Sequence, residues 1–94
     1  MNNNNQPITR NTRVKNELGM HARPASRIAQ MAESATGDVW LEVDGHRVDA
    51  GSIIDILAMC AVKDTAIGVT VAAEADLPVL EKIVDFFESG FGEM

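Results

Sequence analysis

The stretch from Gly19 to Ala35 reads GMHARPASRIAQMAESA and indicates a glycine loop that leads into a helix. From Ala22 onward its apolar residues recur at spacings of three and four, which is the pattern of an amphipathic helix. Pro24 falls in the first turn, where a missing backbone N–H removes no helical hydrogen bond. The sequence therefore predicts a helix over Ala22–Ala35, with His21 at or beside its N-cap.

Strand patterns lie on both sides of this helix. Alternating apolar and polar residues predict strands, and the last of them is also rich in Val and Ile. These segments are Ile8–Lys15, Val39–Val43, a returning strand that contains Val48 and Ala50, and Ala66–Ala73. Asp44-Gly45 predicts a tight hairpin turn between the second and third strands.

Two further helices are indicated by their start signals. Ser52-Ile53-Ile54-Asp55 has the form of a capping box and predicts a short helix to about Cys60. Asp76 is the predicted N-cap of the last helix, with Pro78 in its first turn. The apolar face of that helix is predicted to consist of Leu80, Ile83, Val84, Phe87 and Phe91, and Gly90 and Gly92 are expected to end it.

The predicted order is βαββαβα, and the fold class is α+β. Each helix has a single apolar face, so we expect a four-stranded antiparallel sheet covered on one face by three helices, with the other face exposed to water. The asparagine-rich start of the chain has no apolar stretch behind it. We therefore interpret residues 1–7 as a disordered N-terminal tail and residues 8–94 as one domain.

Composition excludes several classes of protein. No apolar run approaches the roughly 20 residues that cross a bilayer, so no membrane insertion is expected. The net charge of −6 argues against nucleic acid as the partner. Cys60 is the single cysteine, which suits a cytoplasmic protein, and we expect it to be a small buried apolar residue.

Positive charge is concentrated near His21. Residues 1–31 hold five basic side chains and one acidic one, whereas residues 32–94 hold three basic and thirteen acidic ones. A cationic rim around a histidine suits an anionic ligand or an acidic partner surface. A chance distribution of solvated charges is the alternative.

The residues around His21 are those that bind and transfer a phosphoryl group. The first N–H groups of a helix have no backbone partners and attract anions, and Arg23 adds a guanidinium that can bind phosphate oxygens. The same positive field favours neutral imidazole, whose lone pair can attack phosphorus. From these residues alone, a histidine that only caps the helix remains the alternative.

The segment Asn16–Ala25, NELGMHARPA, closely resembles the active-site segment of HPr, the histidine-containing phosphocarrier family of the bacterial phosphoenolpyruvate:sugar phosphotransferase system. The resemblance covers roughly residues 10–90. It implies an open-faced β-sandwich and a phosphoryl carrier rather than a stand-alone enzyme. His21 would accept a phosphoryl group through Nδ1 from phospho-enzyme I, with Arg23 as its stabiliser. An enzyme IIA domain would then receive the group, in sugar uptake or its regulation.

Ser52 matches the regulatory serine of the resembled family, which a dedicated kinase phosphorylates in many bacteria. The resemblance thus implies a serine kinase or phosphorylase as a further partner. The alternative is a purely structural role, because serine is a good N-cap. We expect a monomer without cofactor or metal, since the other histidine, His46, has no second ligand at a useful spacing.

The sequence departs from the family pattern in two places, and the second of them leaves another function open. Cys60 stands where the family often has a glycine, beside the histidine. Gln30, Glu33 and Asp55 stand where members that bind enzyme I often carry lysines. A less basic surface is compatible with a dedicated enzyme I as the phosphoryl donor. It is also compatible with the alternative function of a non-transferring regulatory paralogue that binds a transcription factor or an enzyme.

Overall fold

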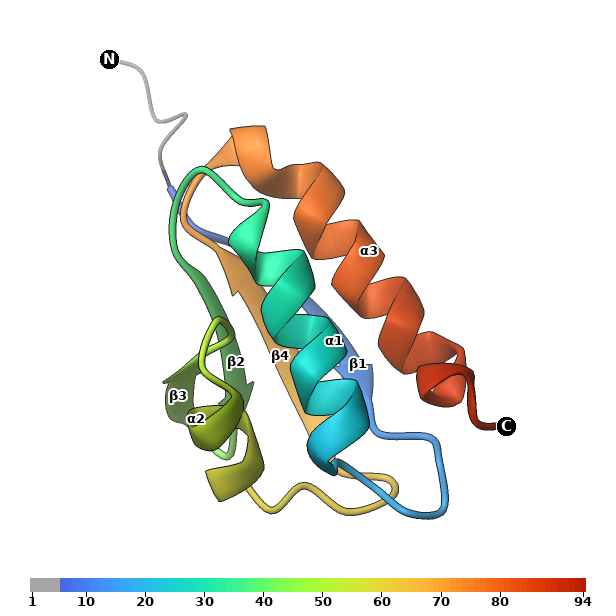
Figure 1. Cartoon of the computed structure of the whole chain (residues 1–94). Helices are drawn as coiled ribbons and strands as arrows, with labels where there is room; N and C mark the ends of the chain where they lie inside the picture. Colours follow the sequence, from blue (N-terminus) through green and yellow to red (C-terminus); the bar gives the residue numbers. More distant parts are fainter. Residues whose placement is uncertain (1–5) are drawn as a thin grey trace.

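The computed structural model describes residues 6–94, so the first five residues of the predicted tail lie outside the described part. Figure 1 shows a sheet with helices on one face. In chain order the elements are β1 (Ile8–Arg13), α1 (Ala22–Glu33), β2 (Val39–Val43), β3 (His46–Asp49), α2 (Ile53–Ala58), β4 (Ala66–Val71) and α3 (Leu77–Glu88), with 3-10 turns at Glu74–Asp76 and Gly90–Gly92. The predicted element order and fold class are confirmed.

The sheet has the strand order β1-β4-β2-β3, and every neighbouring pair is antiparallel. β2 and β3 form the predicted hairpin around Asp44 and Gly45, whose φ angles of 52° and 81° are those of a primed two-residue turn. β1 reaches the sheet only by pairing with β4, from Ile8 opposite Val71 to Arg13 opposite Ala66. The loop that follows β1 therefore starts at a fixed point at the end of the sheet.

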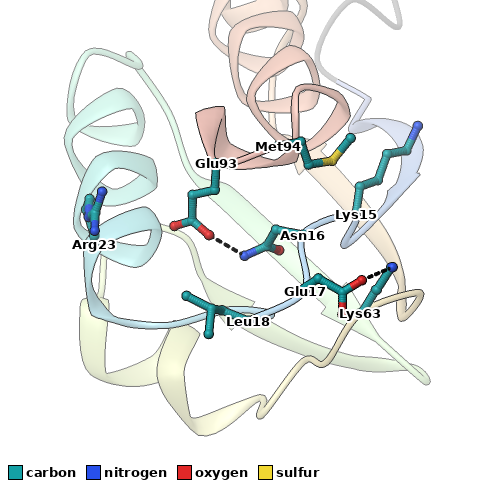
Figure 2. Close-up of a pocket in the computed structure, with 8 residues that line it drawn as sticks. All are labelled: Lys15, Asn16, Glu17, Leu18, Arg23, Lys63, Glu93 and Met94. Carbon is teal, nitrogen blue, oxygen red and sulfur yellow. Dashed lines mark hydrogen bonds and ion pairs between the residues drawn. The ribbon is translucent and has the colours of Figure 1, made fainter.

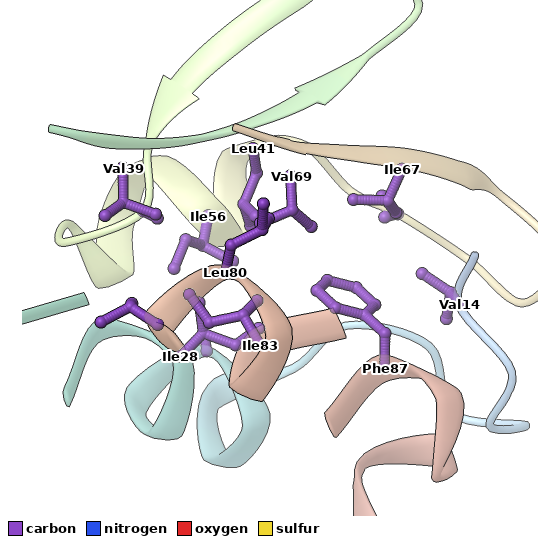
Figure 3. Close-up of a cluster of buried hydrophobic side chains, with 14 of the residues drawn as sticks. Val14, Ile28, Val39, Leu41, Ile56, Ile67, Val69, Leu80, Ile83 and Phe87 are labelled. Carbon is purple, nitrogen blue, oxygen red and sulfur yellow. The ribbon is translucent and has the colours of Figure 1, made fainter. Parts of the chain in front are cut away.

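The core lies between the sheet and the two long helices. α1 and α3 lie side by side over the sheet, and α2 packs beside β3 (Figure 1). Figure 3 shows Leu41, Ile67 and Val69 pointing from the sheet toward Leu80 and Ile83 of α3. All five side chains are at most 1% exposed. Ala25 and Ile28 of α1 are fully buried in the same core, and this burial fixes the start of α1, which carries His21.

Several element boundaries differ from the predicted ones. β1 ends at Arg13 rather than Lys15, β4 ends at Val71 rather than Ala73, and α1 ends at Glu33 rather than Ala35. α2 ends at Ala58, and Cys60 lies beyond it, exposed and with a φ of 53°. The prediction that Cys60 is buried is therefore wrong. Its left-handed backbone explains why a glycine suits this position. Within residues 6–94 no helix has the length and apolar character needed to cross a membrane.

Asp76 begins α3 as predicted, but its carboxylate does not cap that helix. It is 2% exposed, and its Oδ1 and Oδ2 accept from the backbone N–H groups of Thr36 and Gly37, both at 2.8 Å. The Thr36 hydroxyl donates to the same carboxylate. Asp76 thus joins the start of α3 to the loop that follows α1. The bond from the Thr36 N–H is the main reason that the pKa of Asp76 lies below its usual value, against burial, which raises it.

We expect Asp76→Asn to lower the free energy of unfolding by about 2 kcal/mol at neutral pH, because an amide cannot accept from both backbone N–H groups. Since folding lowers the pKa of this carboxyl, its stabilising effect is complete above the unfolded-state pKa of about 4 and is lost as the pH falls through the folded-state value. Urea denaturation of both proteins between pH 7 and pH 2 measures this. A difference that stays constant below pH 4 would contradict the assignment.

The chain turns back after α3 instead of ending with it. Phe91, predicted as part of the helix, lies in the turn Gly90–Gly92 with a φ of 59°. Its ring is 7% exposed and packs against Phe86 and Phe87, with centroids 5.1 and 5.0 Å away. The turn directs the next residue, Glu93, toward the loop that precedes α1.

Candidate functional site

The loop between β1 and α1 is anchored where Gly19 meets the segment after α2. Gly19 has a φ of +72°, and a Cβ placed on it would lie 2.8 Å from the Ala61 carbonyl oxygen. The next residue, Met20, donates its N–H to that same oxygen at 2.9 Å. Glycine is therefore required by both the backbone conformation and the space. The contact fixes the point from which the chain enters α1.

His21 is the N-cap of α1, as predicted, with an extended backbone and no side-chain capping bond. Its carbonyl accepts the first helical bond, from Ala25. Within residues 6–94 the N–H groups of Ala22 and Arg23 donate to no acceptor. The side chain of His21 is 30% exposed, so the ring is neither packed into the interior nor fully in solvent. The site can present both a ring nitrogen and two open backbone donors to an anion.

Glu93 contacts the ring, and nothing in the sequence analysis predicted this. Its Oε2 lies 2.6 Å from His21 Nε2, and its Oε1 accepts from Asn16 Nδ2 at 2.7 Å. The same Nδ2 donates to the Gly19 carbonyl at 2.9 Å. Figure 2 shows Glu93 extending from the end of the chain toward Asn16. The glycines around Phe91 were the one signal in the sequence that the chain could return here.

The hydrogen bonds and charges around Glu93 favour the ionised form of its carboxyl. The hydrogen bond from Asn16 is the largest cause that lowers the pKa of its carboxyl below the usual value. Burial opposes this, and His21 and Arg23 lower the pKa further. Asn16 is 1% exposed, and its Oδ1 is buried without a partner in the described part of the chain. The Asn16 side chain thus leaves its oxygen without a hydrogen bond, while its NH2 group donates to the Gly19 carbonyl and to Glu93.

The predicted cationic rim is narrower in the structure. Of the basic residues predicted to form it, Lys15 is paired with Glu88. Lys63, which lies outside the predicted rim, is paired with Glu17. Two further basic residues are engaged elsewhere, since Arg13 donates to the Asp64 carbonyl and Arg27 lies over the Phe86 ring.

Arg23 is exposed at the second position of α1, and among residues 6–94 its side chain forms no ion pair. It lines a pocket of about 380 Å³ together with Asn16 and Glu93 (Figure 2). His21 and Arg23 both lie near enough to Glu93 to lower the pKa of its carboxyl, and Arg23 is left available to an anion.

Ser52, the third predicted site residue, is the N-cap of α2, and its Oγ accepts from the Asp55 N–H at 3.2 Å. The capping box is only half formed, because the Ser52 N–H donates to the Asp49 carbonyl instead. The shorter side chain of Asp55, where the motif has Glu or Gln, accounts for the missing half. Ser52 and Cys60 flank α2, and His46 is exposed on β3. None of them hydrogen-bonds the side chains of His21, Arg23 or Glu93 within residues 6–94.

Comparisons with known proteins agree on one family. The family model described as "PTS HPr component phosphorylation site" matches residues 8–89. The chain is 38% identical over 81 residues to the phosphocarrier protein HPr of Chlamydia pneumoniae. The match covers 86% of this chain and 75% of that one. It is 30% identical over 87 residues to the phosphocarrier protein NPr of Escherichia coli K12, with 92% and 97% covered. The crystal structure of HPr from Thermoanaerobacter tengcongensis superposes with a TM-score of 0.82 at 31% identity, covering 93% of this chain and 98% of that one.

Proposed function

The chain belongs to the HPr family of phosphocarriers, and from this premise we propose that it accepts a phosphoryl group on His21 from phospho-enzyme I and passes it to an enzyme IIA domain. One observation carries the proposal. The imidazole of His21 lies at the start of α1, where two backbone N–H groups and the Arg23 guanidinium have no protein partner in residues 6–94. A phosphoryl group on this ring would meet donors that are already in place.

The proposed transfer needs only positioning and charge stabilisation. The lone pair of His21 Nδ1 attacks phosphorus, and the bond from phosphorus to the donor's own atom breaks, with its electron pair returning to the donor. The N–H groups of Ala22 and Arg23 and the Arg23 guanidinium bind the phosphoryl oxygens. Transfer to the acceptor is the same step in reverse, with the acceptor's nucleophile attacking and Nδ1 leaving.

We further propose Ser52 as the site of regulatory phosphorylation. Its hydroxyl lies at a helix start, where a phosphate could still accept from the Asp55 N–H. The added charge of about −1.5 to −2 would lie between Asp49 and Asp55, beside exposed Ile53 and Ile54. A phosphate there would therefore repel an acidic partner and make the surface of α2 less apolar. Intact-mass measurement after incubation with a cognate serine kinase and ATP would detect it, and a Ser52→Ala protein that is modified equally would contradict the assignment.

The proposed function is tested by incubating the full chain with phosphoenolpyruvate and its cognate enzyme I and recording the intact mass. We expect one phosphoryl adduct that is lost in acid and is absent when phosphoenolpyruvate is omitted. Adding a cognate enzyme IIA should return the chain to its unmodified mass. If no cognate enzyme I produces an adduct, the phosphocarrier proposal is wrong, and the regulatory paralogue becomes the better interpretation.

A further inference from the structure

The hydrogen bonds around Glu93 define which atoms carry protons. Asn16 Nδ2 lies within hydrogen-bond distance of two oxygens, the Gly19 carbonyl and Glu93 Oε1. Neither oxygen can donate when Glu93 is ionised, so the amide must present its NH2 group to both. This contact orients the Glu93 carboxylate and directs its other oxygen, Oε2, at the imidazole.

An ionised carboxylate only accepts hydrogen bonds, so His21 Nε2 must carry the proton that it shares with Glu93 Oε2. In a neutral imidazole the proton on one nitrogen leaves a lone pair on the other. Nδ1 is thus the nucleophilic atom. Within residues 6–94 no side chain or backbone group is hydrogen-bonded to Nδ1.

From these contacts we propose that Glu93, oriented by Asn16, is a positioning residue that holds His21 in the tautomer with a lone pair on Nδ1. The inference rests on the proposed function for its consequence in phosphoryl transfer. When Nδ1 takes up the group, the ring becomes cationic, and the proton on Nε2 stays where it was. The Glu93 carboxylate then faces that positive charge and stabilises it.

The arrangement is held in place before any phosphoryl group arrives. Phe91 is 7% exposed and is fixed by two neighbouring phenylalanine rings, only two residues before Glu93. Asn16 is 1% exposed, and the loop it stands on is anchored to the Ala61 carbonyl through Met20. Both supports of the carboxylate therefore belong to the rigid part of the fold, as a positioning contact requires.

Glu93→Gln is the sharpest test, because Asn16 decides which way the new amide faces. The NH2 group of Asn16 requires the carbonyl oxygen of Gln, so the NH2 group of Gln is left facing His21 Nε2. That nitrogen must then accept, and the proton moves to Nδ1, where it blocks the attack. We expect nitrogen chemical shifts from NMR to report an inverted tautomer. We also expect phosphorylation by enzyme I to slow by up to about 10⁴-fold, the loss that follows when a catalytic histidine is held in the wrong tautomer.

Glu93→Ala serves as the second variant, since it removes the carboxylate without supplying a donor. We expect it to be phosphorylated more slowly than the wild type but faster than Glu93→Gln. A loss of charge alone would affect both variants equally, and a loss of packing would affect Glu93→Ala more. Glu81→Gln is the matched control, because Glu81 is exposed on α3 and forms no ion pair among residues 6–94.

The outcomes separate this inference from the proposed function. If Glu93→Gln retains the wild-type tautomer, or is phosphorylated as fast as Glu93→Ala, the positioning role is wrong while the phosphocarrier proposal stands. If the tautomer inverts but the wild-type chain accepts no phosphoryl group, the positioning role stands and the proposed function fails.

Discussion

His21→Ala is expected to abolish the acid-labile phosphoryl adduct completely, because the variant loses the only nucleophile at the start of α1. The backbone donors and the Arg23 guanidinium remain, but they can only bind the group and cannot form a bond to phosphorus. The helix itself should survive, since the His21 side chain makes no capping bond. The measurement is intact mass after incubation with enzyme I and phosphoenolpyruvate, with circular dichroism to establish that the variant is folded.

The chain offers a matched control in His46→Ala, since His21 and His46 are its only histidines. His46 is exposed at the start of β3, opposite Val43, and within residues 6–94 no helix begins beside it. Although its imidazole is chemically the same, the described part of the chain provides it with no helix start whose open N–H groups could hold the phosphoryl oxygens. We therefore expect His46→Ala to be phosphorylated like the wild type. An adduct that persists in His21→Ala and disappears in His46→Ala would reverse the site assignment.

The parts of this site that could be predicted from sequence are local. His21, Ala22, Arg23 and Pro24 are consecutive, so one helix start determines both the place of the ring and the open N–H groups around it. The helices and strands were predictable for the same reason, because their apolar spacing is a property of short segments. The predicted elements differ from the observed ones only by a few residues at their ends, where the preference of the local sequence for helix or strand is weakest.

The parts that could not be predicted depend on residues that are distant in sequence. Glu93 is 72 residues from His21, and Asp76 is 40 residues from Thr36. An acidic residue after a glycine-rich turn has no preferred partner until the packing of Phe91 sets its direction. Asp76 resembled an ordinary helix cap, because its role as an acceptor for the loop after α1 depends on how α1 and α3 pack. The partners of both carboxylates are therefore set by tertiary packing and not by the local sequence.

Gly19→Ala is expected to lower the free energy of unfolding by roughly 3 kcal/mol. A left-handed backbone costs an alanine about 1–2 kcal/mol, and overpacking costs a further 1–3 kcal/mol. The second cost applies here because the new Cβ would lie 2.8 Å from the Ala61 carbonyl oxygen and 3.1 Å from Val62 Cα. Both are backbone atoms, which cannot rotate away as a side chain could. Urea denaturation at neutral pH measures the change.

Gly45→Ala is the matched control for the cost of placing an alanine in a left-handed backbone conformation. Gly45 has a φ of +81°, but a Cβ placed there would meet no atom of residues 6–94 within 4 Å. It therefore carries the left-handed cost alone, about 1–2 kcal/mol. Each substitution also lowers the conformational entropy of the unfolded chain, and this effect is the same for both and cancels in the comparison. The difference between the two variants isolates the contact between the loop and Ala61.

That contact also links stability to function, since Met20 donates to the same Ala61 oxygen immediately before His21. If the backbone shifts to relieve the clash, this bond lengthens and the ring moves relative to Asn16 and Glu93. We therefore expect folded Gly19→Ala to be phosphorylated more slowly than folded Gly45→Ala, which leaves the loop untouched. Equal stabilities and equal rates in the two variants would mean that the loop tolerates a side chain at Gly19, and that its anchoring to Ala61 does not set the position of His21.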